Sequence, residues 1–189
     1  MALGDGRVNT VLLQLLRLTC GVILGIAFVL PCGAQMLKYD NEEEIYGAAA
    51  TSPGAVMQVV RKLISFCEDY DSNLRASGEA EMNRWTERHA AYLVIHRKVR
   101  QQVLAAMNDP RQPATERDAI KNMFEKVEPQ AIQSQFESFA APIRAMTSPA
   151  MRIGMCKSYL KAIDDGEFDL KRNDPTLAAW FDKQIADRH

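Results

Sequence analysis

The sequence has little of what usually marks an enzyme, a cofactor-binding protein or a metalloprotein. Its 189 residues include only three histidines and four cysteines. They contain no Cys-x-x-Cys, Gly-x-Gly-x-x-Gly, His-Glu-x-x-His or Gly-x-Ser-x-Gly motif, and no phosphate-binding Gly-Lys-Ser/Thr loop. We therefore predict no catalytic residue, no cofactor and no metal site from local motifs. Catalysis by carboxylates from separate helices needs no local motif, so an enzyme stays open as an alternative.

An excess of one charge is also missing. The 23 basic and 24 acidic side chains leave a net charge of -1, which gives no general attraction to nucleic acid or to an acidic membrane. The segment Arg84–Arg100 is locally basic and contains Trp85 and Tyr92, but these aromatics fall on the apolar face of a helix and most charges on the other. We therefore expect no nucleic-acid binding. Hydrophobic residues at 47% and charged residues at 25% are typical of one folded domain.

The first 34 residues have the pattern of a secretory signal peptide. An uncharged apolar stretch, Leu18–Leu30, follows Arg17, and the small residues up to Ala34 form a cleavage site before Gln35. This predicts a periplasmic or secreted protein. The alternative is an uncleaved membrane anchor, because the apolar run counted back to Val11 is about as long as a bilayer is thick.

After residues 1–34, the sequence predicts a loose arm over residues 35–51 and a helical domain over residues 52–189. The arm lacks periodicity, and Ser52-Pro53 resembles a helix start. Apolar residues then recur at helical spacing in segments without convincing strand patterns. These segments are 53–71, 77–107, 115–143 with an interruption at Pro129, 149–163, and 175 onward. The predicted fold is an all-α, single-domain bundle of five or six helices.

Two cysteines remain after the predicted cleavage. Cys67 and Cys156 each lie on the apolar face of a predicted helix, so both sulfurs can face a common core. An exported protein meets an oxidising compartment. The sequence therefore predicts one intramolecular disulfide between them.

The best binding candidates lie on one stripe of the predicted helix 77–107. Trp85, His89, Tyr92 and His96 follow one another in steps of three and four residues. Seven residues separate the two histidines by roughly 10 Å along a helix, too far to share one metal ion. Each could join ligands from another helix, act as a pH-dependent contact, or simply be a hydrogen-bonded histidine at the edge of a core, which we favour.

Short motifs give the chain a resemblance to a group of proteins. Four segments carry it, in this order along the chain: Cys67, Trp85-Thr86-Glu87-Arg88, Cys156-Lys157-Ser158-Tyr159-Leu160 and Gly166-Glu167-Phe168-Asp169-Leu170. In this order they resemble small exported all-helical proteins of Gram-negative bacteria, over about residues 55–185. The resemblance implies a helical fold and export. It implies no activity.

Two classes of function follow. The first is a non-catalytic module that binds another exported protein or a small apolar ligand, with a membrane contact only through an uncleaved signal segment and an oligomeric state left open. The second is a hydrolase-type enzyme that combines a histidine with Glu68, Asp69 and Asp71. Clustered carboxylates of this kind are more often a solvated helix end, so we favour the binding module.

Overall fold

A computed structural model describes residues 39–187, and all regular secondary structure in them is helical. The elements are α1 (Glu42–Glu68), α2 (Leu74–Arg88), α3 (Ala90–Met107), α4 (Ala114–Asn122), the π-helix η2 (Met123–Val127), α5 (Glu128–Ala145), α6 (Pro149–Asp164), α7 (Leu170–Asn173) and α8 (Pro175–Ala186). The predicted all-α, single-domain bundle with one disulfide is confirmed. The described chain has more helices than the predicted five or six, because the predicted segments 77–107 and 115–143 are each divided.

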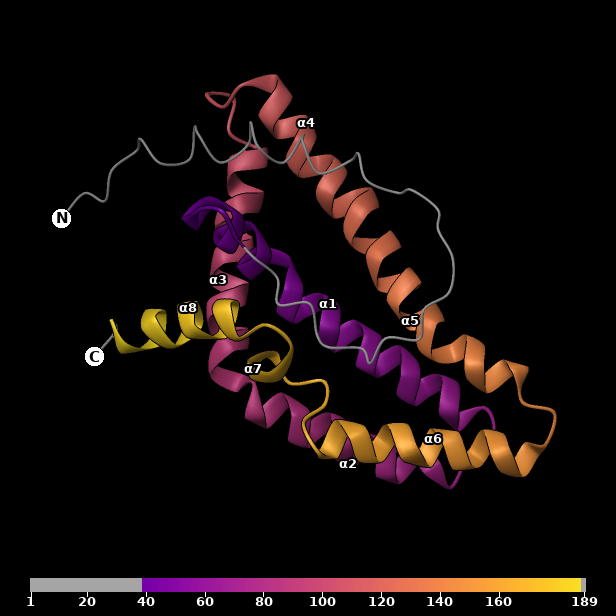
Figure 1. Cartoon of the computed structure of the whole chain (residues 1–189). Helices are drawn as coiled ribbons and strands as arrows, with labels where there is room; N and C mark the ends of the chain where they lie inside the picture. Colours follow the sequence, from indigo (N-terminus) through magenta and orange to yellow (C-terminus); the bar gives the residue numbers. More distant parts are fainter. Residues whose placement is uncertain (1–38, 188–189) are drawn as a thin grey trace.

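Helix α1 is the centre of the bundle. It contacts α2, α3, α5, α6 and α8, and Figure 1 shows it running between the α4–α5 arm and the lower pair of α2 and α6. Its C-terminal half is buried in one apolar cluster with α2, α5 and α6, and its N-terminal half in a second cluster with α3, α7 and α8. The first cluster contains both cysteines and Trp85, and the second contains Tyr92 and Phe181.

The prediction of a loose arm over residues 35–51 was wrong from residue 42 onward, where α1 begins. The side chain of Asn41 caps the helix by accepting a hydrogen bond from the Glu44 N–H at 2.9 Å. Acidic side chains at positions 42–44 occupy the first turn, where the partial positive charge of a helix N-terminus stabilises them. The acidic run is thus a helix start, and Ala49 and Ala50 behind it are fully buried.

Pro53 lies inside α1 and does not start it. A proline has no N–H, so it cannot bond to the carbonyl oxygen of Ala49 four residues earlier. His96 of α3 replaces that donor, with Nδ1 2.9 Å from the Ala49 oxygen. The ring can approach because residue 54 is a glycine, where a Cβ would lie only 2.7 Å from His96 Nε2. The backbone defect in α1 is therefore repaired from α3.

The predicted helix 77–107 is two helices, α2 and α3, that meet at His89 (Figure 1). His89 has φ -102° and ψ 6°, outside the helical region. The apolar stripe continues across the break, which is why periodicity alone did not reveal it.

Pro129 divides the next predicted segment, as expected. It lies in the first turn of α5, directly after the π-helix η2. The Glu128 N–H bonds to the Met123 carbonyl five residues back, which is the wider π pattern.

The disulfide joins α1 to α6. Cys67 and Cys156 are 89 positions apart in the sequence, with Cα atoms 5.5 Å apart, and both are essentially fully buried. Of the helices in the described part of the chain, none is long and apolar enough to cross a membrane. The predicted signal segment, residues 1–34, lies outside the described residues.

Candidate functional site

The candidate site is a cavity of about 260 Å³ where the α2–α3 junction faces α7 and α8. We call it the His89 pocket. It contains two of the four residues predicted from the sequence, His89 and Tyr92, and brings further charged residues to them. Its lining residues are Arg88, His89, Ala91, Tyr92, Asp169, Lys171, Asp182 and Ile185.

Trp85 lies beneath the pocket and does not line it. Its side chain is 1% exposed, and its indole N–H donates to the Phe168 carbonyl at 3.2 Å. The indole is stacked on the His89 ring with centroids 4.1 Å apart. Trp85 therefore supports His89 from the core, and it is not available to a ligand.

His89 is held by backbone atoms on both ring nitrogens. Nδ1 lies 2.8 Å from the Trp85 carbonyl oxygen, and Nε2 accepts a hydrogen bond from the Leu170 N–H at 3.1 Å. Burial lowers the pKa of His89 below its ordinary value, and the charge of Arg88 acts in the same direction. The hydrogen bond to Trp85 and the charge of Asp169 oppose this shift of the pKa. His89 is thus a neutral imidazole at the edge of the core, as favoured from the sequence.

Tyr92 forms the opposite wall of the pocket. Its ring stacks on Phe181 of α8, and its hydroxyl donates to Asp182 Oδ1 at 2.6 Å. Asp182 also pairs with Lys171, with Nζ and Oδ2 3.3 Å apart. Hydrogen bonds from Tyr92 and Lys171 lower the pKa of Asp182, whereas burial and the hydrogen bond to Asp182 raise the pKa of Tyr92. The lysine and the carboxylate at this wall are therefore both charged at neutral pH.

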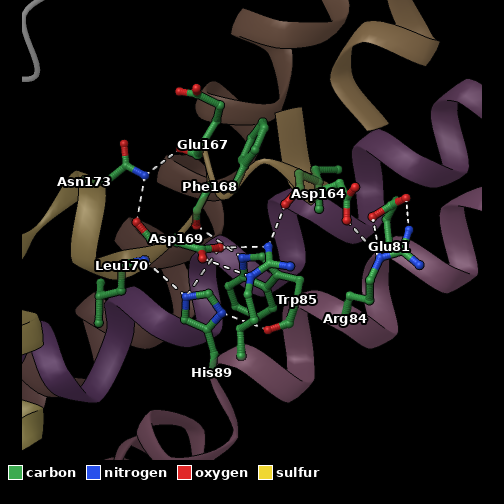
Figure 2. A network of polar contacts seen from close by, with 12 residues as sticks. Glu81, Arg84, Trp85, His89, Asp164, Glu167, Phe168, Asp169, Leu170 and Asn173 are labelled. Carbon is green, nitrogen blue, oxygen red and sulfur yellow. Dashed lines mark hydrogen bonds and ion pairs between the residues drawn. The ribbon is translucent and has the colours of Figure 1, made fainter. Parts of the chain in front are cut away.

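Arg88 and Asp169 also line the pocket, and sequence reasoning did not select either as a site residue. The Arg88 guanidinium binds both Asp169 carboxylate oxygens, at 2.9 and 3.0 Å, and donates to the Ile163 carbonyl at 2.6 Å. Asp169 follows the turn at Gly166, whose φ of +79° favours glycine. Figure 2 shows Trp85 and His89 lying against Phe168 and Asp169, which belong to the segment between α6 and α7.

Two of the motifs that carry the resemblance therefore meet in space. Residues 85–88 of α2 and the adjoining His89 make hydrogen bonds to residues 168–170 through three pairs of groups: Trp85 and a carbonyl, Arg88 and a carboxylate, and His89 and an N–H. The order of the motifs along the chain was the one signal that marked Arg88 and Asp169, and it did not show that they touch.

His96 is not part of the pocket. It is 6% exposed between α1 and α3, where it bonds to the Ala49 carbonyl. Burial lowers the pKa of His96. Among the described residues, no group of three or more His, Cys, Asp or Glu side chains is placed to hold a metal ion.

In the part of the chain that the structure describes, the carboxylates of the alternative enzyme lie away from His89. Glu68, Asp69 and Asp71 lie where α1 ends and before α2 begins, whereas His89 follows the last residue of α2. That helix has 15 residues, which corresponds to a length of about 22 Å. Asp71 instead accepts hydrogen bonds from the backbone and side chain of Asn73. Asp71 thus stabilises the turn before α2.

A comparison with known proteins gives no relative to guide the assignment: the chain matches no family model, no curated protein and no solved structure.

Proposed function

We propose that the protein is an exported, non-catalytic binding module, and that the His89 pocket holds a side chain of a partner protein. The size of the pocket carries this proposal. A volume of about 260 Å³ lies below the range of about 300–1,000 Å³ typical of small-molecule sites. One or two side chains of a partner fill such a cavity.

The charges around the pocket support a protein partner over a small apolar ligand. Arg88 pairs with Asp169, and Lys171 pairs with Asp182 at the rim. The side chains of Lys171 and Asp182 are 68% and 51% exposed, so they are free to exchange solvent for polar groups of a partner. An apolar ligand would remove water from these charges without replacing its hydrogen bonds.

The hydrogen bonding of His89 supports binding over catalysis. Both ring nitrogens already contact backbone groups, so His89 would have to give up a structural hydrogen bond to accept a proton from a substrate. Export is supported by the predicted signal segment, and a buried disulfide is compatible with it.

The test is site-specific photo-cross-linking in the exporting cell. A photoreactive residue replaces Lys171 at the rim, and the matched control replaces Lys157, an exposed lysine on α6 that does not line the pocket. We expect a specific adduct from position 171 and none from position 157. With the purified partner, Lys171→Ala should weaken binding about tenfold and Lys157→Ala less than about twofold. Equal adducts from both positions, or equal losses of affinity, would contradict the proposal.

A further inference from the structure

The hydrogen bonds of His89 fix which nitrogen carries its proton. The Trp85 carbonyl oxygen can only accept, so the proton of the neutral ring is on Nδ1. Nε2 is then the unprotonated nitrogen, and it accepts from the Leu170 N–H. This second bond exists only while the ring is neutral.

The Leu170 N–H depends on His89 because of its place in the chain. Leu170 is the first residue of α7, and the first N–H groups of a helix have no partner within that helix. The residue is 5% exposed, so water cannot readily replace a lost acceptor. Histidine 89 therefore caps α7 from 81 positions away in the sequence.

An alternative partner for a protonated ring is already in place. Asp169 Oδ1 lies 3.9 Å from Nε2, and the same carboxylate holds Arg88. A proton on Nε2 removes the acceptor of Leu170 and gives His89 a positive charge that competes with Arg88 for Asp169. The titratable and charged groups that line the pocket with His89, from every element around it, are Arg88 of α2, Tyr92 of α3, Asp169 before α7, Lys171 of α7 and Asp182 of α8.

We propose that protonation of His89 is an acid switch that frees the start of α7 from α2 and thereby dismantles the His89 pocket. Two of the three contacts between residues 85–89 and 168–170 change when Nε2 binds a proton. Lys171, which follows Leu170 directly, then loses its fixed position opposite Asp182. The loss of partner binding in acid rests on the proposed function, whereas the release of α7 does not.

The experiment measures hydrogen exchange of the Leu170 amide by NMR in the purified protein without a partner. The ring nitrogens of His89 are followed in the same samples from about pH 7.5 downward past the ordinary histidine pKa of about 6.5, because burial lowers the pKa of His89. After correction for intrinsic exchange, protection of Leu170 should fall about tenfold or more as His89 titrates, because each pH unit below the pKa raises the protonated fraction tenfold relative to the neutral one.

Two glutamine variants separate the switch from general acid loosening. His89→Gln keeps an acceptor for Leu170 but does not titrate, so its Leu170 protection should stay constant over this range. His96→Gln is the matched control, because it removes the other buried histidine and should retain the wild-type loss at Leu170. Constant protection in the wild type while His89 titrates would overturn the proposal, and so would an equal loss in His89→Gln.

Charge variants keep the proposal testable if His89→Gln does not fold. Asp169→Asn removes a group that favours the protonated ring, so the midpoint for loss of Leu170 protection should move to lower pH. Arg88→Gln removes a group that opposes it, so the midpoint should move to higher pH. Midpoints that do not move in these directions would contradict the switch. Because no partner is present, this result is independent of the cross-linking at position 171.

Discussion

Removal of the disulfide should destabilise the protein mainly through its unfolded state. The bond between Cys67 and Cys156 closes a loop of about 90 residues. In the chain-entropy model, closing such a loop lowers the entropy of the unfolded chain by about 15.5 cal/mol/K. This corresponds to about 4.6 kcal/mol of stability at 25 °C. Engineered disulfides often deliver less, so we expect a loss of about 2–4 kcal/mol in the free energy of unfolding. A typical domain has only about 5–15 kcal/mol in total.

The assay is urea denaturation of the Cys67→Ala/Cys156→Ala protein and of the oxidised wild type. The variant should unfold at lower urea, and its m-value should rise because an unfolded chain without the cross-link exposes more surface. The fully reduced wild type is the control for packing. It lacks the cross-link but keeps both sulfur atoms in the core, where Cys67 and Cys156 are each at most 1% exposed. Its stability should lie close to that of the double alanine variant. Two free thiols in the native wild type, or a double variant within about 0.5 kcal/mol of the oxidised protein, would refute this reasoning.

Three further predictions concern Gly54, Glu128 and the buried histidines His89 and His96. Gly54→Ala should lower the free energy of unfolding by about 1–3 kcal/mol in a urea melt, because the new methyl group would displace the His96 ring. Gly47→Ala is the control, because nothing lies within 4 Å of a Cβ at that position. An equal loss in Gly47→Ala would contradict this cause. Glu128→Gln should lower the free energy of unfolding by about 2 kcal/mol in the same assay, because the buried Glu128 carboxylate binds the Arg100 guanidinium through two hydrogen bonds of 2.8 Å. A variant as stable as the wild type would show that the pair contributes nothing. Burial lowers the folded-state pKa of both buried histidines, so below about pH 6.5 the unfolded chain binds more protons and stability should fall as the pH decreases toward those lowered pKa values. Thermal melts from pH 8 to pH 5 check this, and a His89→Gln/His96→Gln protein should show the smaller slope.

Helical periodicity predicted the fold class and the disulfide because both depend on which residues are buried. Cys67 and Cys156 fall on apolar stripes, and burial on those stripes brings them together in one core. The same signal missed the break at His89, since Trp85, His89 and Tyr92 keep their spacing of three and four residues through it. Periodicity records burial and does not record the direction of a helix axis.

The start of α1 shows why local motifs can mislead. Ser-Pro is typical of a first helical turn, but the earlier Asn41 and the acidic run at positions 42–44 mark the start that the structure has. Pro53 is tolerated inside the helix because the donor that replaces its N–H comes from His96, 43 positions later. Partners this distant in sequence lie beyond local propensity. The same is true of the Arg88–Asp169 pair that lines the His89 pocket.

Among the described residues, the two buried histidines are His89 and His96. They occupy one stripe, and each bonds to a backbone group that has no partner within its own helix. His96 donates from Nδ1 to the Ala49 carbonyl that Pro53 leaves without a partner, and a second proton on the ring would leave that donor in place. His89 donates from Nδ1 but also accepts from Leu170 through Nε2, so a second proton removes the acceptor. Burial resists protonation of both rings, yet only protonation of His89 breaks a hydrogen bond between elements that form the pocket. A pH-dependent contact at this stripe therefore belongs to His89, although the sequence presents the two histidines as equivalent.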